Sequence, residues 1–264
     1  MITVYLVRHG QTFFNYFHKI QGRCDSPLTP LGIAQAEATR DYLKEKHVHF
    51  DYAFSSSSER ASDTLEIITE HKMPFKRDKG LKEFAFGRYE AHDESLNPKP
   101  PYNDFFKQFG GESQVEVEER MDKTIRRLLK DIPNGKNVLI VSHGGALMNF
   151  LRKALNSLHP LGKLHYHNCG IVVLNYDGKN FTLKSVANPA PPKKPNNPPV
   201  MVRITASTKN CIMMLNGVAP TAKRIPISCV RSETEIYIMF ITPIPAMKRE
   251  IAAIKLMKVV MILI

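Results

Sequence analysis

The sequence has no tryptophan and only four cysteines among its 264 residues. Cys24, Cys169, Cys211 and Cys229 lie far apart and form no C-x-x-C pair, which argues against a zinc site and against a disulfide framework. Sparse, unpaired cysteine is typical of proteins from a reducing compartment. We therefore expect a cytoplasmic protein.

Long hydrophobic runs are also absent. A membrane-spanning helix needs about 18 or more consecutive apolar residues. The nearest candidate, Ile251 to Ile264, is shorter and carries Lys255 and Lys258. No transmembrane segment is predicted. The chain enters a strand-like run at once, so no signal peptide is predicted either.

Acidic residues are scarce in the C-terminal part of the chain. Residues 190–264 hold 11 of the 37 Lys and Arg but only 3 of the 25 Asp and Glu, and the net charge of the whole chain is +12. The basic character therefore belongs mainly to this tail. The tail could bind a membrane surface or nucleic acid, or it could lack a selected fold. Because it has neither interleaved aromatic residues nor a clean amphipathic period, we favour the second interpretation and expect no nucleic-acid partner.

Composition also divides the chain into three parts. Residues 188–200 are rich in proline and predict a semi-rigid linker. The linker separates a domain at residues 1–187 from a basic tail at residues 201–264. This tail contains 7 of the 11 methionines and none of the 10 histidines.

Three short apolar runs end in residues that can carry chemistry. Ile2 to Val7 predicts a buried strand that ends on Arg8, His9 and Gly10. Phe50 to Ser55 leads into a serine-rich loop and then to Arg60, in the first turn of a predicted helix. Asn137 to Val141 ends on Ser142-His143-Gly144-Gly145. Open α/β sheets build their sites at such carboxyl ends, where Arg can bind phosphate and neutral His can act as a nucleophile.

The sequence contains capping signals that predict two helix starts. Thr29 followed by Pro30 predicts an N-cap and a helix that runs to about Lys46. Ser113 with Glu116 forms a capping box, and the helix that follows is predicted to extend to about Asp131. Its arginines are assigned to the solvated face; they are Arg120, Arg126 and Arg127.

Two further candidates have ordinary structural interpretations. Glu83 lies between aromatic residues, an environment that can raise the pKa of a carboxyl group, although a solvated surface Glu is the commoner case. His165 and His167 alternate along a predicted strand, Leu164 to Tyr176, and could resemble a metal pair. No third ligand accompanies them, so we predict a structural role and no metal site.

Several separated motifs together resemble the histidine phosphatase superfamily, the phosphoglycerate-mutase-like proteins. They occur in the family's order and cover about residues 1–187. The matching segments are Arg8-His9-Gly10-Gln11-Thr12 with Asn15, Gln21-Gly22, Arg60-Ala61 with Thr64, Glu83 with Gly87 and Glu90, and Ser142-His143-Gly144. Tyr89 replaces the usual Trp, and Ala91 replaces a common Gly; the second departure concerns loop shape more than chemistry.

The resemblance implies an α/β fold, a three-layer sandwich whose central sheet is mostly parallel and flanked by helices. It implies that His9 is the nucleophile and that Glu83 donates a proton to the leaving alcohol. Further residues are expected to surround the phosphoryl group or line its entrance: Arg8, Arg60 and His143 in the first role, and Asn15, Gln21, Gly22 and Gly144 in the second. The partner is a small phosphate ester, with no cofactor, because guanidinium groups supply the positive charge.

Two alternative functions remain at this point. A phosphoglycerate mutase is disfavoured because Phe86 stands three residues after Glu83, where mutases of the family carry Tyr. A non-catalytic protein that acts through its basic tail is disfavoured because it would not need all five catalytic candidates. In the family, the segment corresponding to His92–Phe109 covers the site and sets substrate choice. Neither the natural substrate nor the oligomeric state follows from the sequence.

Overall fold

The protein is described here by a computed structural model covering residues 1–155 and 167–189, together with five short strands between residues 202 and 263. The chain divides into two compact units, Met1–Pro195 and Asn196–Ile264. Most of the predicted linker, residues 190–200, lies outside the described residues.

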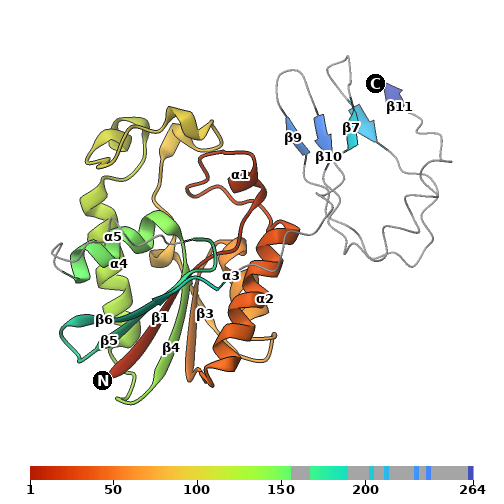
Figure 1. The fold of residues 1–264 in the computed structure, drawn as a ribbon. Coiled ribbons are helices and arrows are strands. Elements are labelled where there is room, and N and C mark those ends of the chain that lie inside the picture. Colours follow the sequence, from red (N-terminus) through yellow and green to blue (C-terminus); the bar gives the residue numbers. More distant parts are fainter. Residues whose placement is uncertain are drawn as a thin grey trace. The chain divides into compact units, whose positions relative to one another are not determined.

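The first unit is built on a six-stranded sheet with the order β3-β2-β4-β1-β5-β6 (Figure 1). The strands β1, β4, β2 and β3 run parallel, β5 is antiparallel to β1, and β6 is antiparallel to β5. This confirms a mostly parallel central sheet. The strand bounds are β1 Ile2–Arg8, β2 Tyr52–Ser56, β3 Lys76–Asp78, β4 Asn137–Ser142, β5 Ile171–Tyr176 and β6 Phe181–Ala187.

The centre of this sheet is buried on both faces, as its continuous apolar runs predict. Val4 and Leu6 of β1 point to one core cluster, and Val7 belongs to the cluster on the other face. The register pairs Arg8 with Ser142, so β1 and β4 end side by side. Consequently the residues that follow these two strands are brought together at one edge of the sheet.

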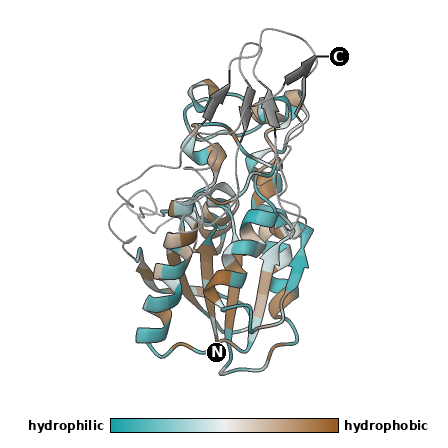
Figure 2. Ribbon diagram, turned by 90° about the vertical axis from the view of Figure 1, so that its right-hand side faces the viewer, coloured by the Kyte–Doolittle hydropathy of each residue, from teal (hydrophilic) through white to brown (hydrophobic). Residues whose placement is uncertain are grey.

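Helices cover both faces of the sheet and complete the three layers. The helices α4 and α5 pack on one face and α2 and α3 on the other (Figure 1). The strands between them carry most of the strongly hydrophobic colour in Figure 2. The helix bounds are α1 Phe13–Tyr16, α2 Pro30–Glu45, α3 Glu59–Ile68, α4 Gln114–Leu129 and α5 Gly144–Ala154.

Both predicted helix caps are confirmed. The Thr29 hydroxyl accepts a hydrogen bond from the Gly32 N–H at 3.0 Å, with Pro30 in the first turn of α2. Ser113 and Glu116 form the reciprocal capping box of α4. Each satisfies N–H groups that have no partner inside the helix. Leu129 ends α4, two residues before the predicted end.

The predicted strand from Leu164 was too long. β5 begins at Ile171, and residues 167–170 form a turn that returns the chain to the end of β1, where the Cys169 N–H donates to the Arg8 carbonyl at 3.0 Å. His165 lies outside the described residues.

Between β3 and α4 the chain has no long element. It forms four short 3-10 helices: η1 Lys79–Leu81, η2 Gly87–Tyr89, η3 Glu94–Leu96 and η4 Phe105–Phe109. Aromatic contacts hold it together. Phe106 is fully buried, and its ring lies 4.8 Å from that of Phe86 and 5.2 Å from that of Tyr102. We refer to residues 84–109 as the aromatic segment.

In the described part of the second unit, five strands form two small sheets. One has the order β7-β10-β9, and β8 pairs with β11 in the other. The bounds are β7 Val202–Ile204, β8 Cys211–Met213, β9 Cys229–Arg231, β10 Ile236–Ile238 and β11 Met261–Leu263. All pairings are antiparallel.

Candidate active site

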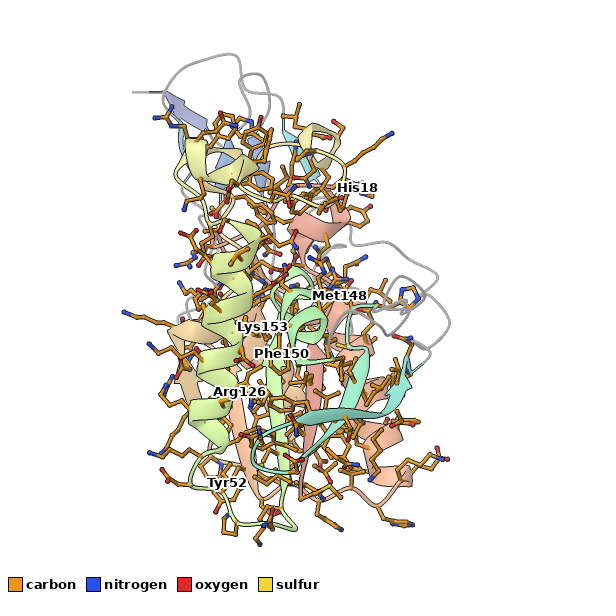
Figure 3. All side chains as sticks on the ribbon, turned by 90° about the vertical axis from the view of Figure 1, so that its left-hand side faces the viewer. His18, Tyr52, Arg126, Met148, Phe150 and Lys153 are labelled. Atoms are coloured by element: carbon orange, nitrogen blue, oxygen red, sulfur yellow. The ribbon has the colours of Figure 1, made fainter. Side chains whose placement is uncertain are left out.

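Three strand ends place the predicted catalytic residues at one edge of the sheet. His9 follows β1, His143 follows β4, and Arg60 lies in the first turn of α3 after β2. In Figure 3, Tyr52 at the start of β2 lies at the end of the first unit opposite His18, which follows α1. The candidate site therefore lies at the carboxyl edge, where open α/β sheets bind ligands.

His9 is buried with only 3% of its surface exposed. Its Nδ1 lies 2.7 Å from the Gly10 carbonyl oxygen. Because a carbonyl can only accept, the proton must sit on Nδ1, and Nε2 keeps its lone pair. The Gly10 N–H in turn donates to the Thr64 hydroxyl at 3.0 Å, which fixes this turn against α3.

The electrostatic surroundings keep His9 neutral. Burial, followed by the positive charges of Arg60 and Arg8, lowers its pKa well below the ordinary value of 6.5. Neighbouring cations and a low dielectric both disfavour the imidazolium ion. A buried imidazole with a lone pair on Nε2 at neutral pH is chemically competent as a nucleophile.

His143 faces His9, and the two ring centroids are 5.2 Å apart. Its Nε2 lies 2.7 Å from the Ser56 hydroxyl, while its buried Nδ1 has no hydrogen-bond partner among the described residues. Burial, then Arg60 and His9, lowers its pKa well below 6.5. Ser56 was not identified from the sequence, because a run of four serines reads as a polar loop.

Arg60 is fully buried and organises the loop that follows α1. Its Nη1 donates to the Cys24 carbonyl at 2.8 Å and to Asp25 Oδ1 at 2.9 Å, and its Nη2 donates to the Gly22 carbonyl at 2.8 Å. Its Nε is buried without a partner in the described part of the chain. A buried cation with an unused donor beside His9 is suited to hold an anion.

Glycines at two predicted positions make room for neighbouring side chains. Gly22 has φ +53°, and a β-carbon there would lie 2.5 Å from Glu90 Oε1. A β-carbon at Gly144 would lie 3.1 Å from Arg8 Nε. The Arg8 guanidinium therefore passes against the start of α5, close to His143, and any larger residue at position 144 would displace it.

Glu83 occupies the N-terminus of α5. Its Oε1 accepts from the Ala146 N–H at 2.7 Å and the Phe84 N–H at 2.8 Å, and its Oε2 accepts from the Gly145 N–H at 3.1 Å. The sequence predicts the Glu83 carboxyl group among aromatic residues and does not predict these backbone N–H partners. The N–H groups and dipole of a helix start stabilise a negative carboxylate.

Two predicted binding residues border the His9 turn. Asn15 Oδ1 accepts from the Thr12 N–H at 3.2 Å and from Asn168 Nδ2 at 3.3 Å. Gln21 Oε1 accepts from the Thr12 hydroxyl at 3.0 Å, and its buried Nε2 has no partner among the residues described. Asn168 Nδ2 also donates to the His9 carbonyl at 3.0 Å. No motif marked Asn168, which is 159 residues from His9 in sequence.

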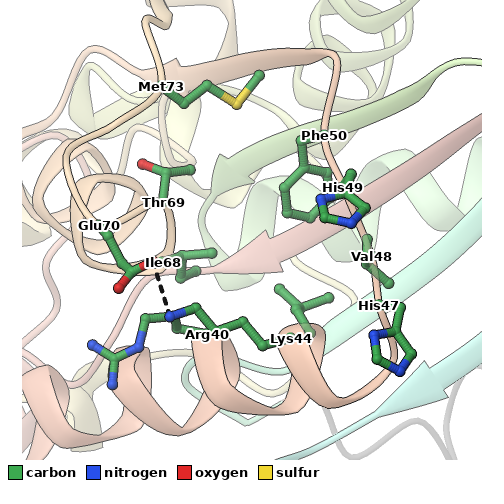
Figure 4. Close-up of a pocket in the computed structure, with 11 residues that line it drawn as sticks. Arg40, Lys44, His47, Val48, His49, Phe50, Ile68, Thr69, Glu70 and Met73 are labelled. Carbon is green, nitrogen blue, oxygen red and sulfur yellow. Dashed lines mark ion pairs between the residues drawn. The ribbon is translucent and has the colours of Figure 1, made fainter.

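A cavity of about 330 Å³ lies elsewhere and contains none of the predicted site residues (Figure 4). It is lined by the C-terminal ends of α2 and α3 and the segment before β2. Of its long charged side chains, Lys44 and Glu70 pair with each other at 2.9 Å, and Arg40 pairs with Asp41 at 2.8 Å. Its chemistry therefore gives no reason to prefer it over the sheet edge.

Within the described residues, no cluster of three or more His, Cys, Asp or Glu could hold a metal ion. In the same part of the chain, none of the helices combines the length and apolar character needed to cross a membrane.

Comparisons with known proteins agree with the motifs. The profile of the histidine phosphatase superfamily (branch 1) matches residues 4–189. The chain is 28% identical to the broad-specificity phosphatase YOR283W of Saccharomyces cerevisiae, over 71% of this chain and 86% of that protein. It is 32% identical to the protein named probable phosphoglycerate mutase GpmB of Yersinia pestis, over 67% of this chain and 86% of the relative.

A solved structure shows the same fold. The phosphoserine phosphatase of Entamoeba histolytica, crystallised in complex with 3-phosphoglyceric acid, superposes with a TM-score of 0.61 at 30% sequence identity. The match covers 70% of this chain and 96% of that one.

Proposed function

This chain belongs to the histidine phosphatase superfamily, and from that premise we propose that it hydrolyses small phosphate monoesters through a phosphohistidine, without a metal ion. The Saccharomyces cerevisiae relative and the Entamoeba histolytica structure support a phosphatase. The proposed phosphohistidine rests on one observation, the contact of His9 Nδ1 with the Gly10 carbonyl oxygen. This contact leaves a lone pair on Nε2 that can attack phosphorus.

In the first step, His9 Nε2 forms a bond to phosphorus while the bond from phosphorus to the ester oxygen breaks. The negative charge of the bound phosphate ester favours the protonated form of the nearby Glu83, which gives its proton to the departing oxygen, so an alcohol leaves. Arg8, Arg60 and His143 hold the phosphoryl oxygens. The two guanidinium groups supply the positive charge that phosphoryl transfer needs, which is why no metal is required by the proposal.

In the second step, water attacks the phosphohistidine. Glu83, now a carboxylate, takes one proton from that water, the nitrogen–phosphorus bond breaks, and inorganic phosphate leaves. His9 returns to its neutral tautomer, and Glu83 is again protonated. Asn15, Gln21, Gly22 and Gly144 are proposed to line the phosphate position, since the first two border the His9 turn and the glycines accommodate Glu90 and Arg8.

The substrate class is proposed from the same comparisons. Phosphoserine and 3-phosphoglycerate are the first esters to screen, because the Entamoeba histolytica structure is that of a phosphoserine phosphatase bound to 3-phosphoglyceric acid. The mutase alternative is favoured by the Yersinia pestis relative and opposed by Phe86, whose ring stacks on Phe84 with centroids 5.0 Å apart and carries no hydroxyl. Formation of 2-phosphoglycerate from 3-phosphoglycerate would support the mutase.

The test is hydrolysis of 4-nitrophenyl phosphate by the full chain, with and without EDTA, beside His9→Ala. We expect EDTA-resistant turnover that falls by at least ~10³-fold in the variant, since the nucleophile is lost. His49→Ala is the matched control, because His49 is exposed beside the cavity in Figure 4. Turnover that persists in His9→Ala would contradict the proposal, and turnover abolished by EDTA would contradict its metal-independent form.

We propose that residues 1–187 form the catalytic domain and that the basic tail at residues 201–264 is dispensable for turnover. Salt-sensitive binding of the tail to anionic lipid vesicles would instead favour a role in attachment.

A further inference from the structure

Arg120 contradicts its predicted place on the solvated face of α4. Its side chain is only 19% exposed, whereas Arg127 on the same helix is 57% exposed. The guanidinium points to the loop that carries Glu83. Its Nη1 donates to the carbonyls of Gly80 at 2.8 Å and Lys82 at 2.9 Å, and its Nη2 donates to the Glu83 carbonyl at 3.3 Å.

Glu112 holds the other side of the same loop. It forms a two-point ion pair with Arg120, with Nε to Oε1 at 2.8 Å and Nη2 to Oε2 at 2.9 Å. Glu112 Oε2 also accepts from the Ala85 N–H at 3.0 Å. One partly buried ion pair therefore binds the backbone on both sides of Glu83, at carbonyls up to residue 83 and at the N–H of residue 85.

The pair also reaches the loop that Arg60 organises. Arg23 Nη2 donates to Glu112 Oε1 at 2.9 Å. Arg23 directly follows Gly22, whose carbonyl accepts from Arg60. Glu112 is thus the common partner of two loops, one bordering the proposed phosphate position and one carrying the proposed proton donor.

Glu112 carries its negative charge although it is partly buried. Burial alone would raise the pKa of Glu112, but the hydrogen bond and charge of Arg120, the Ala85 N–H and Arg23 together keep that pKa below its ordinary value. Glu112 is therefore a carboxylate at neutral pH, and Arg120 is charged at any pH of interest. An ion pair with this many directed contacts restricts backbone motion more than a single hydrogen bond does.

We propose that the Arg120–Glu112 pair is a positioning clamp that holds the loop at residues 80–85 so that Glu83 meets the leaving oxygen. This inference rests on the proposed function, because it takes Glu83 as the proton donor. Among the described residues, the hydrogen bonds of the two clamp side chains are with backbone groups, with one another and with Arg23, so the pair acts through the position of Glu83. A displacement of about 1 Å at a catalytic group can cost about 100-fold in rate.

The first test does not depend on catalysis. The Ala146 N–H donates to Glu83 Oε1, so its hydrogen exchange reports whether the carboxylate is in place. In Arg120→Met we expect exchange at Ala146 to accelerate about tenfold, while Ile140 in β4 is unchanged. Arg126→Met is the matched control, since Arg126 lies on the same helix and pairs with Asp122 (Figure 3). Unchanged exchange at Ala146 in a folded Arg120→Met protein would overturn the clamp.

The second test uses the leaving group. 4-Nitrophenolate leaves readily without a proton, whereas the serine alkoxide of phosphoserine needs one. Because Glu83 also activates water in the second step, which both esters share, the quantity to compare is kcat/KM, which contains only the first step. Arg120→Met should lower kcat/KM for phosphoserine by about 100-fold and kcat/KM for 4-nitrophenyl phosphate by only a few-fold. Arg120→Lys keeps the positive charge but cannot form the two-point ion pair with Glu112. The ratio of its losses on the two esters should be intermediate.

The outcomes separate the two proposals. Equal losses of kcat/KM on both esters would overturn the positioning role. Glu112→Gln is a second variant that keeps the side-chain shape, and we expect the same unequal loss from it. It serves as the test if Arg120→Met does not fold. A wild-type chain that hydrolyses neither ester would overturn the proposed function and the proton-donor role of Glu83, while the exchange at Ala146 would still decide whether Arg120 holds that loop.

Discussion

The two sides of the candidate site are built in different ways. On the side that we propose to bind phosphate, the phosphate side, Arg8 ends β1, and His9 and His143 directly follow the neighbouring parallel strands β1 and β4. Arg60 lies in the first turn of α3, after β2. On the acid side, Glu83 lies in a loop between a three-residue strand and the aromatic segment, and side chains from distant parts of the chain hold it.

The difference shows two ways to fix a catalytic group. A sheet edge positions its residues through strand register, which short-range sequence patterns encode. A loop without regular structure must be fixed by side chains, here Arg120 and Glu112, together with the N–H groups at the start of α5. Changes in the aromatic segment should therefore have little effect on the phosphate side. They should disturb the position of Glu83 on the acid side.

The largest effect is expected on the phosphate side. Arg60→Met removes a buried cation that binds two carbonyls and Asp25, so we expect kcat/KM for 4-nitrophenyl phosphate to fall by about 10³-fold. Arg77→Met serves as a matched control, because its pair with Glu59 is exposed. A loss of less than tenfold in Arg60→Met would show that Arg60 is not part of the phosphate site.

An intermediate effect is expected from the core of the aromatic segment. Phe106→Ala empties a fully buried position and should lower the free energy of unfolding by about 3 kcal/mol, as measured by urea denaturation. Leu96→Ala, at an exposed position of the same segment, should change it by less than about 0.5 kcal/mol. If the two sides are independent, Phe106→Ala should impair phosphoserine hydrolysis more than that of 4-nitrophenyl phosphate; equal losses would contradict this independence.

The smallest effect is a pH dependence of stability from the phosphate side. His9 and His143 have folded-state pKa values lowered by burial and by Arg60, whereas in the unfolded chain they titrate near 6.5. Below pH 6.5 the unfolded state therefore binds protons that the folded state does not, and stability falls as the pH falls. Above pH 6.5 neither residue makes the free energy of unfolding depend on pH.

Each of these histidines should contribute up to about 1.4 kcal/mol per pH unit below 6.5. Urea unfolding in phosphate-free buffers at pH 7.5, 6.5 and 5.5 measures the slope. His143→Gln should reduce it, and His49→Ala, which replaces an exposed histidine, should not. An identical slope in wild type and His143→Gln would show that His143 does not resist protonation.

Much of the molecule could be predicted from its sequence. The mostly parallel sheet, the caps at Thr29 and Ser113, and the gathering of Arg8, His9, Arg60 and His143 followed from local patterns and from the resemblance. These features depend on strand ends, helix starts and hydrophobic periodicity, all of which act over a few residues.

The contacts that complete the site were decided by the tertiary structure. Ser56 contacts His143 across 87 positions, Asn168 reaches His9 across 159, and Arg120 holds a loop that begins 40 residues earlier. Polar side chains such as these look solvated in a sequence, because their burial depends on partners that only the folded chain supplies. The sequence alone therefore determined which groups can do the chemistry, and the fold decided which neighbours hold them in position.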